Sequence, residues 1–198
     1  MAKVDITLIQ KLRERTGLGM MDCKKALEET DGDVEKAVEL LRKKGAAVAA
    51  KRSDKTTAQG IVHAYIHPGA QIGVLIEINC ETDFVARTED VKNFAHDVCM
   101  HIAAIRPLYL SADQVEPAYI EKEKEILHEQ LKQLGKTGKI AEQIMEGKLK
   151  KVFSEICLLD QAFVKNDQFT IQQLLEHLIA KTGENIRIAR FARYQIGN

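Results

Sequence analysis

The chain contains 198 residues, of which 45% are apolar and 29% are charged, so it is long enough and apolar enough to bury a core. Lys and Arg together number 29, as do Asp and Glu, and the formal net charge is therefore zero. This balance argues against a protein whose main partner is the phosphate backbone of a nucleic acid.

Three short helices that pack into a small module are predicted within residues 1–45. Apolar residues recur at helical spacing in VDITLIQKL, and Gly17 follows as the expected stop. The second helix begins at MMDC, and we expect one of these two methionines to lie in the core. Asp33 is the expected N-cap of the third helix, and Gly45 is its expected end.

The helical periodicity is lost in residues 46–59, AAVAAKRSDKTTAQ, where small, polar and basic residues dominate. We expect a helical tail that runs into a flexible linker. The composition of this segment therefore predicts a boundary between the N-terminal module and a second domain.

The remaining residues, 60–198, are predicted to form an α+β core and dimerisation domain. A β-hairpin is indicated by IVHAYIH and IGVLIEIN around the turn HPGAQ, and we expect its second, nearly continuous apolar strand to be buried on both faces. A helix should follow and end at Arg106 and Pro107. The chain closes with a strand, IRIARFARYQI. The predicted fold class is therefore α+β, with a small antiparallel sheet covered by helices.

Two capping boxes are predicted in the second half of the chain. The first, at residues 111–114, should open a charged helix that runs to about Leu134. Glycines then interrupt the chain, and we expect one helix through Ile140 to Leu149 and a further segment from Val152 to Leu159. The second box, at residues 170–173, should open a helix that Gly183 ends.

Four isolated cysteines occur along the chain: Cys23, Cys80, Cys99 and Cys157. Their spacing fits neither a zinc site nor a disulfide framework, and scattered cysteines are typical of a reducing compartment. The N-terminal residues lack the apolar run of a signal peptide, and no stretch reaches the roughly 18 apolar residues of a membrane span. We therefore expect a cytoplasmic protein with no membrane partner.

Two long ungapped segments resemble the elongation factor Ts family: LRERTGLGMMDCKKAL at residues 12–27 and EINCETDFVAR at residues 77–87. Weaker likeness continues through IAEQIMEGKLKK, QAFVKND and GENIRIARFARY, so the resemblance covers nearly the whole chain. The long form of this family carries two related core subdomains and a coiled-coil insertion. With one hairpin, one helical set and one closing strand, this chain is similar to the short form.

The resemblance implies a guanine-nucleotide exchange factor that is not an enzyme, uses no cofactor and acts on elongation factor Tu. In this family the N-terminal module, which is similar to ubiquitin-associated domains, docks on the G domain of the GTPase. A TDFV segment then wedges beside the magnesium and phosphate site, and GDP leaves. The matching wedge here is Thr82, Asp83, Phe84 and Val85.

The resemblance also assigns docking positions in the module: Arg13, Thr16, Gly17, Gly19, Met20, Met21, Lys24 and Lys25. In the hairpin, His67 lies where the long form places a histidine near the phosphate loop of the GTPase, although Pro68 intervenes in the turn. His63 is on the same strand as His67 but about 13 Å away by strand rise, so we expect no metal site there.

Other interpretations stay open on the residues alone. Asp83 and Phe84 also fit an ordinary turn cap and a buried aromatic side chain. Cys80 would suit a thiol enzyme only if a histidine approached it in space, because its acidic neighbours should raise a thiol pKa. Basic residues at Lys51 and Arg52 would suit RNA, but the zero charge and few aromatics argue against this. The helical module alone would also fit a general protein-interaction adaptor.

We also expect a homodimer, because a sheet of one hairpin and one added strand leaves open edges, and IGVLIEIN is too apolar to face water. The long form of the family covers the equivalent surface with its second subdomain. A second copy, joined by a two-fold contact, is the expected substitute here. His67 would then act on a GTPase molecule held mainly by the other subunit.

Overall fold

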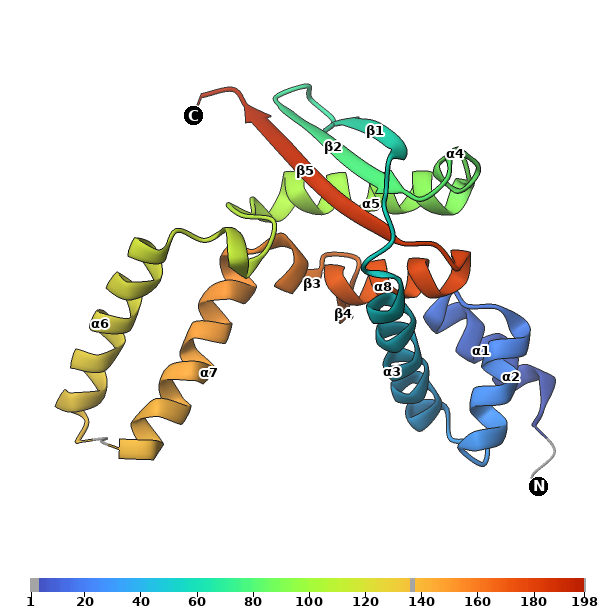
Figure 1. The fold of residues 1–198 in the computed structure, drawn as a ribbon, viewed down its shortest axis with the longest axis horizontal. Helices are drawn as coiled ribbons and strands as arrows, with labels where there is room; N and C mark the ends of the chain where they lie inside the picture. Colours follow the sequence, from blue (N-terminus) through green and yellow to red (C-terminus); the bar gives the residue numbers. More distant parts are fainter. Residues whose placement is uncertain (1–3, 136–137, 198) are drawn as a thin grey trace.

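The computed structural model of the protein describes residues 4–135 and 138–197. It has three parts: a helical module at the N-terminus, a central three-stranded sheet with helices on one face, and a two-helix arm (Figure 1). The module and the arm project on opposite sides of the centre of the molecule. The α+β class predicted from the sequence is confirmed. Within the described residues, no helix is both long and apolar enough to cross a bilayer.

The N-terminal module consists of three helices: α1 (Ile6–Thr16), α2 (Met20–Glu29) and α3 (Val34–Arg52). Asp5 and Asp33 cap the first and third helices, each by accepting a hydrogen bond from a backbone N–H. Gly17 ends α1 in the left-handed conformation, with a φ of 67°. Met20 and Met21 are both exposed, so the expectation that one of them lies in the core is wrong. The buried face of α2 is formed by other residues, among them Cys23, which is fully buried.

Helix α3 does not end at Gly45 but continues to Arg52, which is the helical tail expected at the start of residues 46–59, and β1 begins at Gln59. Gly45 faces His177: a Cβ built there would make an ordinary van der Waals contact with the imidazole ring, at 3.5 Å. Beyond Gly45, Val48 and Ala49 pack against the central core. A glycine inside a continuous helix was therefore misread as a helix stop. The division into two domains at this segment stays a prediction.

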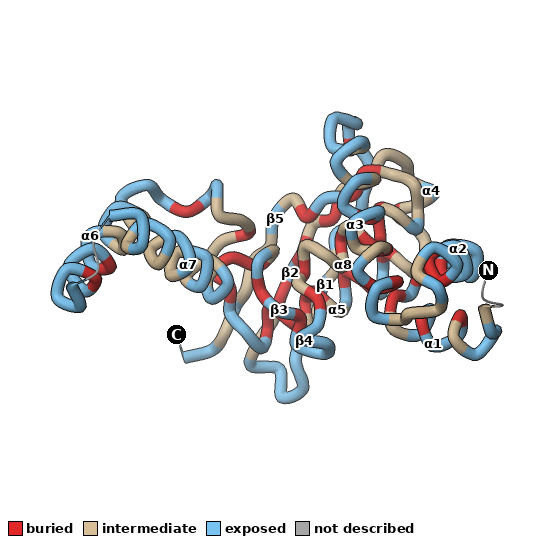
Figure 2. Tube along the Cα trace, turned by 90° about the horizontal axis from the view of Figure 1, so that it is seen from below, coloured by how far each residue is buried: buried red, intermediate tan, exposed pale blue. Residues whose placement is uncertain are grey.

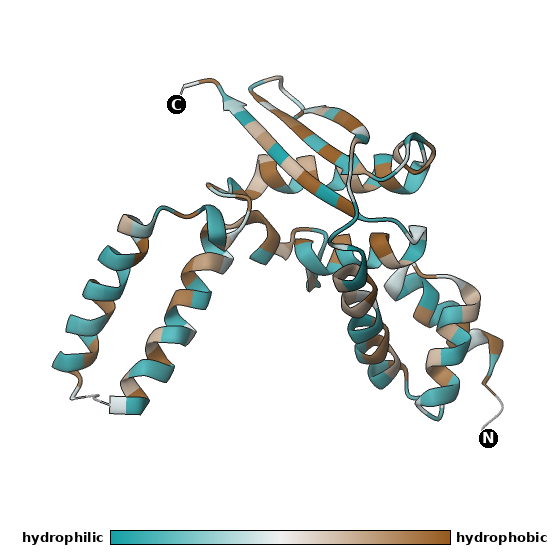
Figure 3. Ribbon diagram, viewed as in Figure 1, coloured by the Kyte–Doolittle hydropathy of each residue, from teal (hydrophilic) through white to brown (hydrophobic). Residues whose placement is uncertain are grey.

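The central sheet has the antiparallel order β1–β2–β5, with strands β1 (Gln59–Ile66), β2 (Ile72–Cys80) and β5 (Ile186–Gln195). Helix α5 (Glu89–Ile105) packs on one face, where Val74 and Ile76 are buried. Polar and apolar residues are interspersed along β5 (Figure 3), where the buried Ile186 and Ile188 flank the exposed Arg187. An antiparallel sheet commonly has one face packed on the core and the other face exposed.

Strand β2 is therefore not buried on both faces, as its composition had suggested. On the uncovered face, Leu75 is 45% exposed, and Glu77 forms an ion pair with Arg190 of β5 at 2.7 Å. The strand register places three cross-strand rows on this outer face: Val62–Glu77–Arg190, Ala64–Leu75–Ala192 and Ile66–Gly73–Tyr194. Most of this surface is apolar.

The arm is formed by two helices, α6 (Pro117–Gln133) and α7 (Gly138–Ile156). Leu127 and Leu131 of α6 are buried, whereas no residue of α7 is fully buried, and most of the arm is exposed (Figure 2). The segment from Val152 does not form a separate element, because α7 runs on to Ile156 before a 3₁₀ turn, η2 (Leu158–Asp160).

The predicted capping box at residues 111–114 does not open α6. Those residues form a 3₁₀ turn, η1 (Ala112–Gln114), in which Gln114 accepts a hydrogen bond from the backbone N–H of Leu110. Helix α6 begins instead at Pro117, whose missing N–H and fixed φ suit the first helical turn.

A second small sheet, which the sequence analysis did not predict, consists of β3 (Ala162–Phe163) and β4 (Asn166–Thr170). It leads into α8 (Ile171–Thr182), where the predicted capping box is confirmed and Gly183 ends the helix. Phe169 of β4 packs into the core of the N-terminal module, and the guanidinium of Arg42 lies 4.4 Å above its ring. Together β4 and α8 join the module to the sheet domain.

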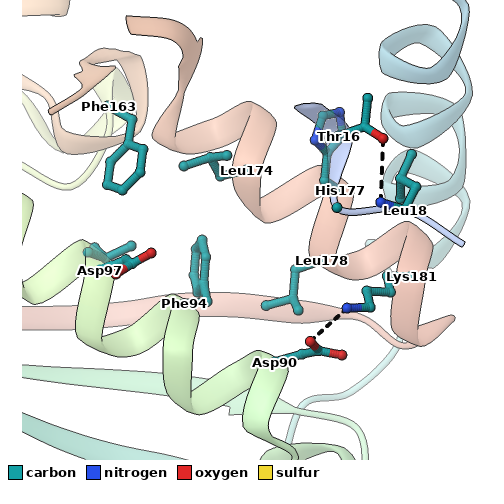
Figure 4. Close-up of a pocket in the computed structure, with 12 residues that line it drawn as sticks. Thr16, Leu18, Asp90, Phe94, Asp97, Phe163, Leu174, His177, Leu178 and Lys181 are labelled. Carbon is teal, nitrogen blue, oxygen red and sulfur yellow. Dashed lines mark hydrogen bonds and ion pairs between the residues drawn. The ribbon is translucent and has the colours of Figure 1, made fainter. Parts of the chain in front are cut away.

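The junction between the module and the sheet domain contains a cavity of about 270 Å³, lined by the α1–α2 loop, α5 and α8 (Figure 4). Phe94 and Leu178 give it an apolar wall, and an ion pair of 2.7 Å between Lys181 and Asp90 lies beside them. His177 also faces this junction, and its Nε2 atom is buried without a hydrogen-bond partner among the described residues.

Acidification should destabilise this junction. Burial, assisted by the nearby positive charge of Arg42, lowers the pKa of His177 from 6.5 to about 4. The unfolded chain then binds the proton more readily, so stability that is complete above pH 6.5 is lost as the pH falls toward 4. We expect His177→Leu to reduce the difference in unfolding free energy between pH 7 and pH 4 by about 2–3 kcal/mol, measured by urea denaturation.

The matched control is His128→Leu, because His128 is exposed on α6. It should leave the pH dependence of the wild type unchanged. If the His177→Leu variant keeps the pH dependence of the wild type, His177 is not the group that makes the junction sensitive to acid.

Candidate partner-binding site

The TDFV segment forms a short projecting turn directly after β2. Its helix, α4 (Asp83–Ala86), has only four residues and is capped by Thr82, whose Oγ1 accepts a hydrogen bond of 3.3 Å from the N–H of Val85. Ala86 is 2% exposed, and Val85 packs against the central core. One side of the turn is therefore anchored in the protein.

The opposite side of the turn carries Phe84, which is 81% exposed, the largest exposed fraction among the large apolar side chains of the described residues. The alternative in which Phe84 is an ordinary core residue is therefore wrong. Asp83 is half-buried and forms an ion pair with Arg87 at 2.9 Å. The turn thus presents an aromatic ring beside a carboxylate, a combination that can bind another protein.

The residues assigned to module docking fall into two groups. Exposed side chains belong to Arg13, Met20, Met21, Lys24 and Lys25. Thr16 is buried instead, where its hydroxyl donates to the carbonyl of Leu12 at 2.8 Å, while Gly17 and Gly19 cap adjoining helix ends. The second group therefore shapes the α1–α2 loop, and the first group provides side chains that a partner can reach.

His67 lies far from the projecting turn. It is exposed at the tip of the β1–β2 hairpin, where its Nδ1 lies 3.0 Å from the hydroxyl of Tyr65. The projecting turn follows the other end of β2, a strand of nine residues. A strand of that length separates the two sites by roughly 27 Å. The structure does not bring His67 and Phe84 of the same chain together.

A polar network behind the turn was missed by the sequence analysis. The carboxylate of Glu184 accepts hydrogen bonds from both the N–H and the hydroxyl of Thr82, and the N–H of Asn185 donates to Glu81 at 2.5 Å. Glu184 and Asn185 both belong to the GENIRIARFARY string, so the family resemblance already included these two residues. What the string could not reveal is that the turn after α8 lies against the turn after β2.

The structure argues against a thiol enzyme at Cys80. Its side chain is buried, and burial together with the negative charge of Glu184 raises the pKa of the thiol to about 11. Almost none of it would be thiolate at neutral pH, and the thiolate is the nucleophilic form.

Neither a metal site nor an RNA site is supported by the side chains. Within residues 4–135 and 138–197, no three His, Cys, Asp or Glu side chains gather as metal ligands. Arg52, a candidate RNA contact, donates to the carbonyl of Gly183 and lies 3.6 Å from the Glu81 carboxylate. These contacts occupy its guanidinium within the protein.

Comparison with known proteins extends over nearly the whole chain. A family model described as elongation factor TS matches residues 19–198. Similar curated proteins include an elongation factor Ts of Carboxydothermus hydrogenoformans, 54% identical over 96% of this chain and 88% of its own length. Another, from Thermotoga maritima, is 53% identical over 98% of this chain and 97% of its own length. A third, from Heliobacterium modesticaldum, is 52% identical over 98% of this chain.

All four thiols should be unreactive in the native protein. Each cysteine is buried, and burial raises the pKa of Cys99 to about 12. We expect a disulfide reagent such as Ellman's reagent to titrate almost no thiol at pH 8 until denaturant is added. Rapid labelling of Cys80 alone in the folded protein would revive the thiol-enzyme alternative.

Proposed function

This chain belongs to the elongation factor Ts family, and from that premise we propose that it promotes release of GDP from elongation factor Tu in the cytoplasm, acting by contact and without catalysing a chemical reaction. The observation that carries the proposal is the exposure of Phe84, at 81%, on a turn whose other side is anchored. A large apolar side chain held in water by a fixed backbone is most simply explained by burial in a partner.

Nucleotide exchange requires a contact that is incompatible with a well-formed nucleotide site. Linkage makes the effect reciprocal: the factor by which the protein weakens GDP binding is the factor by which GDP weakens binding of the protein. Insertion of Phe84 between elements of the GTPase would contribute roughly 2–3 kcal/mol through apolar burial. This free energy can offset the distortion that the wedge imposes on the nucleotide site.

Asp83 adds a negative charge next to the inserted ring. Magnesium in such sites is held by oxygen ligands, and the phosphates are themselves anionic. A carboxylate brought close to them competes for their hydrogen-bond donors and repels the phosphates. In the free protein Asp83 is paired with Arg87, so the two side chains must separate if Asp83 is to act on the nucleotide site.

Docking is assigned to the exposed side chains of the N-terminal module. Met20 and Met21 adjoin Lys24 and Lys25 on α2, a mixture of adaptable apolar and cationic groups suited to a protein surface. The same module alone would fit a general interaction adaptor. That alternative does not account for the exposed ring of Phe84, and we therefore favour the exchange factor.

We further propose that the protein works as a homodimer joined through the outer face of the sheet. Three exposed apolar side chains, Val62, Ile66 and Leu75, support this, because such a surface is costly to leave in water. The distance between Phe84 and His67 within one chain also supports it. In a two-fold dimer, His67 of one copy would contact a GTPase held mainly by the other copy.

Wedge and docking substitutions should affect different kinetic quantities in stopped-flow release of labelled GDP from elongation factor Tu. We expect the double variant Asp83→Ala/Phe84→Ala to lower the maximal rate at saturating factor by about 30-fold or more, since it removes the free energy of apolar insertion. Met20→Ser/Met21→Ser should instead raise the half-saturating concentration about tenfold and change the maximal rate little.

Thermal melting by circular dichroism is the control for both variants. Because Phe84 is exposed, its double variant should melt like the wild type. A double variant that melts normally and still accelerates GDP release fully would refute the wedge assignment.

A charge in the centre of the outer face should dissociate the dimer. We expect the wild type to be dimeric at micromolar concentration and Leu75→Lys to be monomeric, measured by light scattering, because the contact would bury an unpaired ammonium group. The matched control is Ile140→Lys on the arm, where the isoleucine is 60% exposed. A monomeric wild type would rule out the dimer.

A further inference from the structure

Glu184 holds the cap of the projecting turn by two hydrogen bonds. Its Oε1 accepts from the hydroxyl of Thr82 at 2.6 Å, and its Oε2 accepts from the backbone N–H of Thr82 at 3.1 Å. The two residues are 102 positions apart in the sequence, and both are partly buried. Hydrogen bonds to a carboxylate are short and strong, and a bidentate pair also fixes direction.

The bond from the hydroxyl also determines how Thr82 caps α4. A hydroxyl has one proton to donate and lone pairs with which to accept. Because the Thr82 proton points to Glu184, the oxygen is left to accept from the N–H of Val85, at 3.3 Å. Glu184 therefore sets the rotamer and the polarity of the cap from which Phe84 projects.

The residues beside this pair connect the cap to α3. Asn185 is 8% exposed, and its side-chain amide donates to the carbonyls of Ser53 and Lys55, at 3.2 and 2.8 Å. Its backbone N–H donates to Glu81, which also lies 3.6 Å from Arg52 at the end of α3. One network thus joins three segments: the end of α3, the turn after α8 and the base of the wedge.

We propose that Glu184 is a positioning residue for nucleotide exchange: through Thr82 it holds α4 so that the ring of Phe84 is presented to the GTPase in a single orientation. The inference rests on the proposed function. A helix of four residues has almost no stability of its own, so the direction of Phe84 depends on what holds the two ends of the turn. Ala86 is held by the core, and Glu184 holds the other end through Thr82.

A positioning residue should change the maximal rate of GDP release and not the docking affinity. In the stopped-flow assay, we expect Glu184→Ala to lower the maximal rate about tenfold, while the half-saturating concentration stays within about twofold of the wild type. Glu184→Gln should have a rate between those of Glu184→Ala and the wild type, because the amide nitrogen that replaces one carboxylate oxygen cannot accept a hydrogen bond. Glu146→Ala, at an exposed glutamate of α7, is the matched control and should behave as the wild type.

A second readout reports on the turn itself. The N–H of Val85 is bonded to the Thr82 hydroxyl, so its hydrogen exchange in the free protein should accelerate in Glu184→Ala and in Thr82→Val. Thr82→Val keeps the shape of the side chain and removes the hydroxyl, so it should also lower the maximal rate. If Glu184→Ala fails to fold, Glu184→Gln and Thr82→Val decide the question, with thermal melting as the check.

The outcomes separate this inference from the function on which it rests. Loss of rate in Phe84→Ala with normal rates in folded Glu184→Ala and Thr82→Val would overturn the positioning role alone. A normal rate in Phe84→Ala would overturn the wedge itself. A raised half-saturating concentration with an unchanged maximal rate would show that Glu184 serves docking, and would also overturn the proposal.

Discussion

The close packing of α3 on α8 is the contact on which the arrangement of the functional surfaces depends. Gly45 lies against α8 at this contact, near the ring of His177 and the backbone of Glu176. In the same region, Phe169 lies in the core of the module, and Arg52 at the end of α3 lies 3.6 Å from the carboxylate of Glu81. One helix therefore belongs to the N-terminal module at its start and lies at the base of the projecting turn at its end.

The central strand β2 imposes a second constraint, because its two ends carry different candidate contacts. The projecting turn follows Cys80, and the hairpin with His67 precedes Ile72. A strand is stiff, so a single chain cannot bring these groups to one point on a partner. The geometry favours either separate roles for Phe84 and His67 or a shared task performed by two copies.

Local patterns predicted local structure well. The box from Thr170 to Gln173 forms as expected because its partners are three residues apart, and IRIARFARYQI forms the closing strand β5 as predicted. The two main errors had different causes: α3 continues through Gly45 along α8, which is a contact with a distant segment, whereas Pro117 is a local helix start that was passed over for the box at residues 111–114. For the site, the sequence suggested Phe84 through the family resemblance. It could not reveal its exposure or the bond from Thr82 to Glu184, because both depend on tertiary packing.

The two-helix arm has a consequence for the dynamics of the molecule. Its helices bury little: two leucines of α6 are buried and no residue of α7 is fully so, whereas β2 lies between two hydrogen-bonded neighbours over a continuous core. Free energies of local opening follow such differences. The arm can thus unfold and refold as a unit of its own while the sheet and the wedge stay intact, and amide protons in its helices will exchange long before those of the central strand.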